Sequence, residues 1–232
     1  MPIETPLDVL YEDNHLLAVN KPAMLATMGV DAERPSLLAL AKEYLKLKYQ
    51  KPGNVYVGIV SRLDGPVTGV TLMAKTSKAA ARLSEAFRLR RVNKFYFAVV
   101  EGAVEPPSGL LEHHLRKDER HRKVHVTHAA APDAQLARLK YNVSRTAGGL
   151  SLVVVEPETG RKHQIRVQLA KVGHPIVGDR KYGSTRAFGH GIALHSQRLE
   201  FEHPVRHGPL VLEAPFPPAW RKDSQVSLLI RA

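Results

Sequence analysis

The sequence predicts an α+β fold, with a mostly antiparallel or mixed central sheet flanked by helices. Short strand-like runs, bounded by turn residues, recur along most of the 232 residues. Amphipathic helical patterns occur in only about three places, without the regular alternation of βαβ units. No repeat, low-complexity tract or linker interrupts the chain, so we expect a single domain over residues 1–232 with a core of about 7–220.

The strand segments are rich in β-branched or alternating apolar residues. Two of them surround an Asp-Asn turn and end at Pro22, which cannot continue a ladder. The expected strands are two within 9–22, then 54–60, 69–75, 94–100, 123–128, 134–143, 150–156, 193–201 and 209–215. The Pro-rich residues 213–220 are expected to be an extended surface segment or a turn.

Three segments carry the apolar spacing of a helix, and their ends carry suitable signals. Ser36 can cap the first, and the second begins at Thr76 and ends in a group of arginines, which the helix dipole favours there. The third ends before Gly173, which can take the left-handed conformation after a helix. These segments are 35–50, 76–91 and 162–173.

The composition indicates a polyanionic partner. The chain has 34 Lys+Arg against 22 Asp+Glu, a formal net charge of +12, and basic groups within 82–94 and 116–123. Nucleic acid is the first choice and a membrane surface the second. The sequence has 0 cysteines, two acids near its start and no apolar run of about 20 residues. We therefore expect a cytoplasmic protein without disulfides, thiolate metal sites or a membrane partner.

Four separated stretches mix polar and apolar residues as a site would: "NKPA" at 20–23, "RLDG" at 62–65, "KFY" at 94–96 and "ETGRKHQIR" at 158–166. Each alone has an ordinary interpretation: a strand end, an Asp-Gly turn, a core tyrosine and a surface helix.

In this order and spacing the four stretches resemble the RluA-type RNA pseudouridine synthases. The resemblance extends through "GHPIVGDRKYG" at 173–183 and "LHSQRLEFEHP" at 194–204. Two departures surround Asp64: Ser61 stands where the family has His, and Val67-Thr68 where it has Thr-Ser. The resemblance implies the pseudouridine synthase fold, as a stand-alone catalytic domain without the N-terminal S4 domain of many members.

The resemblance also implies an isomerase that converts a specific uridine in rRNA or tRNA to pseudouridine. Asp64 is the implied essential carboxylate, and Arg166 its guanidinium partner, which favours the ionised form of a carboxylate. Tyr96 would stack on the flipped uracil and could serve in proton transfer at C5. Ile165 would line the pocket, and Arg62 would enter the base stack as the nucleotide flips out.

Four further residues of the matching motifs are expected to bind substrate or support the pocket: Lys21, Arg161, His163 and Gln164. The isomerisation needs no redox change and no hydrolysis, so we expect no cofactor and no metal. RNA is the expected partner, and we expect a monomer.

Alternatives remain open at this point. A catalytically inactive RNA-binding or assembly protein could keep the same fold. A glycosidase-like hydrolase would need a second acid beside Asp64, where the motifs offer arginine. The five histidines between 113 and 128 could suggest a metal site, but their spacing suits no single face, and we expect an exposed hairpin there.

Overall fold

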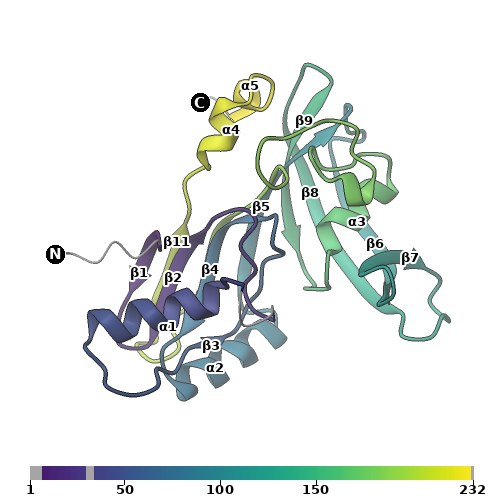
Figure 1. The fold of residues 1–232 in the computed structure, drawn as a ribbon. Helices are drawn as coiled ribbons and strands as arrows, with labels where there is room; N and C mark the ends of the chain where they lie inside the picture. Colours follow the sequence, from purple (N-terminus) through teal and green to yellow (C-terminus); the bar gives the residue numbers. More distant parts are fainter. Residues whose placement is uncertain (1–6, 30–33, 231–232) are drawn as a thin grey trace. The chain divides into compact units, whose positions relative to one another are not determined.

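The computed structural model describes residues 7–29 and 34–230, and these form two compact units (Figure 1). The first unit comprises the described residues of Met1–Asn93 and Ser196–Pro215, and the second those of Lys94–His195 and Phe216–Ala232. Both units contain helices and strands, which confirms the predicted α+β class. The expectation of a single domain stays a prediction.

The first unit is built on an antiparallel ladder in which β2 (Leu16–Lys21) lies between β1 (Val9–Glu12) and β4 (Thr68–Ala74). The short β3 (Gly58–Ile59) pairs with β4, and β10 (Leu194–Glu202) pairs with β11 (Pro209–Glu213). The predicted hairpin over 9–22 is therefore confirmed, whereas the strand expected over 54–60 is reduced to two residues.

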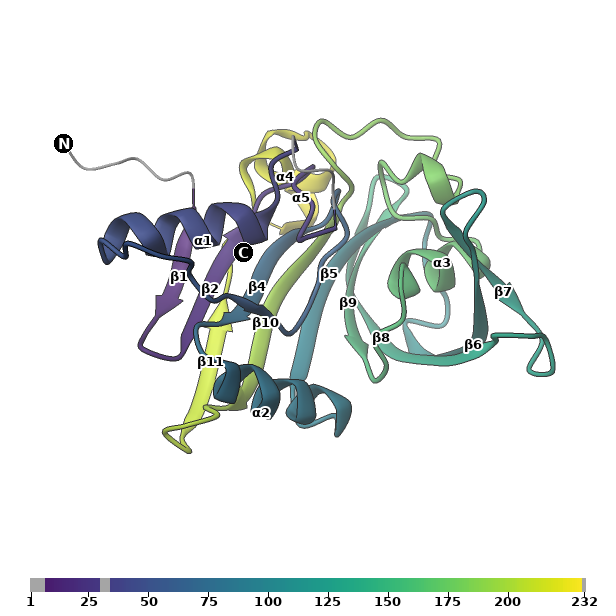
Figure 2. The ribbon, with the colours of Figure 1, turned by 60° about the horizontal axis from the view of Figure 1, so that its bottom comes forward.

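Helices cover both faces of this ladder (Figure 2). Leu17 and Val19 pack in the cluster of α1 (Leu37–Lys48), while Leu16 and Ala18 pack in the cluster of α2 (Ser77–Arg88). All four side chains are fully buried, which explains why β2 reads as a continuous apolar run instead of an alternating one. Ser36 and Thr76 cap the two helices as predicted, each accepting a backbone N–H at 3.2 Å.

Among the described residues of the second unit, five strands lie side by side, each antiparallel to the next. In spatial order they are β5 (Asn93–Glu101), β9 (Leu150–Pro157), β8 (Gln135–Ala147), β6 (Ser108–Asp118) and β7 (Lys123–Thr127). The helix α3 (Gln164–Lys171) lies against the curved strands β8 and β6 (Figure 2), with Val167 packed on Leu115, Val124 and Ala137.

Two expectations need correction. The extended segment expected over 213–220 contains the start of α4 (Pro218–Lys222), which is followed by α5 (Val226–Ile230). Trp220 decides this, because its side chain is fully buried and stacks on Phe216 with ring centroids 5.2 Å apart. The strand β6 was not expected, although the exposed hairpin that it forms with β7 was, and that hairpin is confirmed.

Within the described ranges, no helix is long and apolar enough to cross a membrane.

Candidate active site

Asp64 lies in the first unit, in the loop that joins β3 to β4. Its carbonyl accepts the N–H of Val67 at 3.0 Å, which closes a turn around Gly65. Along this loop Arg62 is exposed, Leu63 is buried and Asp64 is half-buried. The turn that the Asp-Gly pair predicts is therefore present, and Asp64 is half-buried within it.

Lys21 is the last residue of β2, and its side chain binds the backbone of this loop. Its side chain is fully buried, and Nζ donates to the carbonyls of Pro22, Leu25 and Gly65 at 2.8–3.0 Å. An ammonium has three donors, and these three carbonyls use them all. Burial lowers the pKa of Lys21 to about 7, and the negative charge of Asp64 acts in the opposite direction.

Gly69 follows the loop and lies opposite Lys21 in the β2–β4 ladder. It has φ +111°, and a Cβ built on it would lie 2.2 Å from the carbonyl oxygen of Ser196. Glycine is therefore required on two grounds, backbone conformation and close approach of a neighbouring backbone.

Tyr96 lies in the second unit, in β5 opposite Val155 of β9, and is half-buried. Side chains alternate across a strand, so Tyr96 and Phe97 point to opposite faces. Phe97 packs on Phe216, with ring centroids 5.2 Å apart, and Tyr96 is therefore on the face turned away from Phe216.

The segment before α3 is held by Gln164, which is buried. Its Oε1 accepts from the Thr159 hydroxyl at 2.7 Å and the Arg161 N–H at 3.0 Å, and its Nε2 donates to the Arg138 carbonyl at 3.0 Å. His163 is left-handed at φ 55°, directly before the helix. These bonds fix the loop 159–163 on β8. The substrate-binding role expected for Gln164 and His163 stays a prediction.

Arg166 is buried in α3 and forms a bidentate pair with Asp179, Nε to Oδ2 at 2.7 Å and Nη2 to Oδ1 at 2.9 Å. Its guanidinium carbon lies 5.1 Å from the ring centroid of Tyr182. The Tyr182 hydroxyl also lies 2.7 Å from Nδ1 of His163. Asp179 and Tyr182 thus fix the plane of the guanidinium. The expected pairing of Arg166 with Asp64 joins residues of different units and stays a prediction.

Sequence reasoning did not assign a role to Asp179 or Tyr182. Both lie in the "GHPIVGDRKYG" stretch, around the short 3₁₀ turn η1 (Arg180–Tyr182). The available signal was an acidic and an aromatic residue within a matching motif. The sequence does not show that both contact Arg166 of α3, because that contact depends on the fold. The remaining predicted residues of this region are Ile165, which is buried, and Arg161, which is exposed and donates to the Leu136 carbonyl at 3.0 Å.

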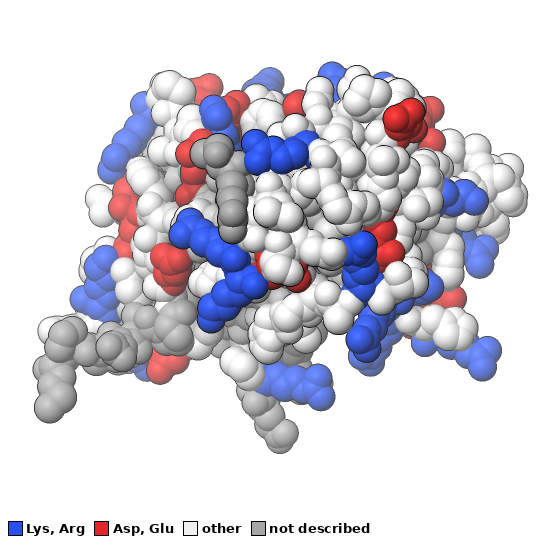
Figure 3. All heavy atoms as spheres, turned by 90° about the horizontal axis from the view of Figure 1, so that it is seen from above, with Lys and Arg blue, Asp and Glu red and all other residues white. Residues whose placement is uncertain are grey.

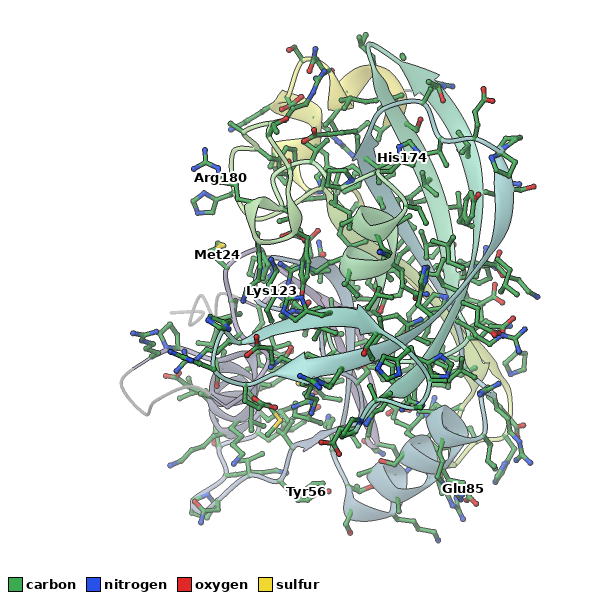
Figure 4. The ribbon with its side chains drawn as sticks, turned by 90° about the vertical axis from the view of Figure 1, so that its right-hand side faces the viewer. Met24, Tyr56, Glu85, Lys123, His174 and Arg180 are labelled. Atoms are coloured by element: carbon green, nitrogen blue, oxygen red, sulfur yellow. The ribbon has the colours of Figure 1, made fainter. Side chains whose placement is uncertain are left out.

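The histidine-rich hairpin of β6 and β7 also contacts Tyr182. The Tyr182 hydroxyl accepts the Val124 N–H at 3.0 Å, and the Lys123 ammonium, labelled in Figure 4, lies 5.4 Å from the Tyr182 ring centroid. At the tip, His121 and His125 face Asp118. Among residues 7–29 and 34–230 no group of three or more His, Cys, Asp or Glu is placed to hold a metal ion.

Basic side chains form several groups on the face shown in Figure 3, with acidic side chains between them. Lys and Arg side chains at a surface can contact the phosphates of a polyanion.

The RNA pseudouridylate synthase family model matches residues 15–171. A curated relative, the uncharacterized RNA pseudouridine synthase YhcT of Bacillus subtilis, is 36% identical over 214 residues, covering 91% of this chain and 69% of the relative. The chain belongs to the RNA pseudouridylate synthase family. The enzyme class predicted from the sequence is thereby confirmed at the level of the family, whose members are isomerases.

Other similarities agree with this family. The dual-specificity RNA pseudouridine synthase RluA of Vibrio vulnificus is 33% identical, covering 89% of this chain and 82% of the relative. The solved human RNA pseudouridylate synthase domain containing 4 matches with a TM-score of 0.76 at 24% identity, covering 91% of this chain and 89% of that one. The predicted pseudouridine synthase fold is confirmed.

Proposed function

We propose that this chain isomerises a specific uridine in ribosomal or transfer RNA to pseudouridine, with Asp64 as the essential carboxylate. Relatives in the same range of identity are named ribosomal large subunit pseudouridine synthase and tRNA pseudouridine synthase. The observation that supports the role of Asp64 is its place in a turn: the residues on both sides are held by hydrogen bonds within the first unit, and Asp64 itself is half-buried.

The reaction balances within one nucleotide. The bond between N1 of uracil and C1′ breaks, a bond between C5 and C1′ forms, the C5 proton leaves, and N1 ends with a proton. A carboxylate can serve as a nucleophile toward the base or C1′, or as a base toward the C2′ proton. Each route needs the Asp64 carboxylate beside the target nucleotide.

Other residues take roles that follow from this chemistry. Arg166 is the proposed partner of Asp64, and its bidentate pair with Asp179 supports this role because the guanidinium is already oriented. Tyr96 is proposed to stack on the uracil and to take part in proton transfer at C5. Exposed Arg62 is suited to enter the base stack when the nucleotide flips out.

Four residues around these have supporting roles in the proposal. Ile165 lines the pocket, and exposed Arg161 contacts phosphate. His163 and Gln164 hold the loop before α3. Lys21 holds the Asp64 loop, since its three donors are bound to backbone carbonyls.

Release of tritium from RNA that carries [5-³H]uridine tests the proposal, because the C5 hydrogen must leave. We expect release by the wild-type protein and none by Asp64→Asn. Asp8→Asn is the matched control: Asp8 is an exposed aspartate of the same unit, bonded to Asn20 at 2.9 Å, and this variant should keep full activity.

RNA binding is measured on the same variants. Asp64→Asn should bind RNA as the wild type does, with an affinity that falls steeply as salt rises. Binding without tritium release by the wild-type protein, on total cellular RNA, would instead support the inactive RNA-binding alternative.

A further inference from the structure

The residues on both sides of Asp64 are held by side chains from one short segment, residues 21–27. On the N-terminal side, Thr27 Oγ1 donates to the Leu63 carbonyl at 2.8 Å and accepts the Leu63 N–H at 3.2 Å. One hydroxyl therefore satisfies both backbone groups of the residue before Asp64. Thr27 is 3% exposed and Leu63 9% exposed, so water does not substitute readily for these bonds.

On the C-terminal side, Lys21 Nζ donates to the Gly65 carbonyl at 3.0 Å. The backbones of Leu63 and Gly65, the two chain neighbours of Asp64, are thus each hydrogen-bonded by a side chain of the segment 21–27. These bonds restrict rotation of the peptide groups on both sides of Asp64, which set the direction of the Asp64 side chain.

The segment 21–27 is itself anchored. Lys21 lies in the β2–β4 ladder opposite Gly69. The carbonyls of Ala26 and Thr27 accept the N–H groups of Leu37 and Leu38 at 2.8 and 3.1 Å. These N–H groups belong to the first turn of α1, where no intrahelical acceptor exists. Thr27 is therefore tied to α1 through its backbone and to the Asp64 loop through its hydroxyl.

We propose that Thr27 is a positioning residue for Asp64, which acts together with Lys21 by fixing the backbone on both sides of the carboxylate. The proposal rests on the proposed role of Asp64 as the essential carboxylate. Displacement of a catalytic group by about 1 Å can cost about 100-fold in rate. Loss of the Thr27 hydroxyl should therefore slow the chemical step more than it weakens RNA binding.

Single-turnover tritium release at saturating RNA separates these effects. We expect Thr27→Val to be about 10- to 100-fold slower than the wild type, with RNA affinity within about twofold. Thr27→Ser keeps the hydroxyl and should stay within about threefold of the wild-type rate.

Thr71→Val is the matched control. Thr71 is a fully buried threonine of β4, and in the described part of the chain its hydroxyl has no hydrogen-bond partner. The same substitution there removes no bond to the loop, so the rate should equal that of the wild type.

Thermal unfolding establishes which variants fold. Valine places a methyl group where the hydroxyl lies 2.8 Å from a carbonyl oxygen, so Thr27→Ala, which avoids that overlap, is measured beside it with the same expectation. The proposal is wrong if a folded Thr27→Val or Thr27→Ala protein keeps the wild-type rate at saturating RNA. It is equally wrong if the loss is confined to RNA affinity, or if Thr71→Val loses as much. Absence of tritium release by the wild type would instead refute the proposed function.

Discussion

Replacement of Gly69 by alanine should destabilise the first unit severely. The added Cβ would lie 2.2 Å from the Ser196 carbonyl oxygen, whereas real Cβ contacts essentially never fall under 3.0 Å. The β4 and Ser196 backbones must therefore separate locally by about 0.8 Å. Alanine at φ +111° adds about 1–2 kcal/mol of backbone strain, and overpacking of a buried position costs about 1–3 kcal/mol. We expect a loss of about 2–5 kcal/mol in the free energy of unfolding.

Urea unfolding followed by circular dichroism measures this loss, since the free energy of unfolding falls linearly with urea concentration. Gly53→Ala is the matched control, because its added Cβ has no neighbour within 4 Å and its φ lies outside the left-handed range. That variant should stay within about 0.5 kcal/mol of the wild type. A Gly69→Ala protein as stable as Gly53→Ala would refute the close approach of these two backbones.

Three further substitutions test the electrostatics of buried groups by urea unfolding. Burial raises the pKa of Glu12, but hydrogen bonds from two lysines and two tyrosines outweigh it and lower the pKa to about 2. The advantage of the wild type over Glu12→Gln should therefore be complete above about pH 4.5 and disappear as the pH falls toward 2; a constant difference would contradict this. Burial lowers the pKa of Lys21 to about 7 from an ordinary 10.5, so the unfolded chain binds more protons between these values. The free energy of unfolding of the wild type should therefore increase relative to that of Lys21→Met as the pH rises through this interval. A difference that decreases with rising pH would refute the lowered pKa of Lys21. Asp179→Asn removes the bidentate carboxylate partner of the buried Arg166 guanidinium and should cost about 3 kcal/mol, whereas a cost under about 1 kcal/mol would argue against a buried, bidentate ion pair.

Much of the fold could be predicted from local pattern. The caps Ser36 and Thr76 mark true helix starts, because their side chains bond to backbone N–H groups only three residues away. The β1–β2 hairpin also follows from local signals. Such features depend on residues close in sequence, which a pattern contains.

The missed elements lack such local signals. In β6 only Leu115 is buried, so no alternation of apolar residues indicates a strand, and pairing with β8 supplies its stability. The helices α4 and α5 have five residues each, too few to show a period of 3.6. Burial of Trp220 stabilises α4, and that depends on tertiary packing.

The candidate site shows the same division. Motifs indicated, by residue type and order, the groups that we propose to carry the chemistry, Asp64 and Arg166. They could not identify Asp179 or Thr27, because the hydrogen bonds of these residues join partners 13 and 36 residues away in the chain. A buried hydroxyl and a carboxylate in a turn have many possible partners, and only the folded backbone selects one.

Pseudouridine mapping by reverse transcription decides whether Asp64 carries the reaction. Total RNA is compared between cells that lack the gene and cells complemented with the wild type, Asp64→Asn or Asp8→Asn. We expect at least one modified uridine to be absent without the gene, restored by the wild type and by Asp8→Asn, and still absent with Asp64→Asn. Restoration by Asp64→Asn, or an RNA map that does not change when the gene is removed, would contradict the proposed function.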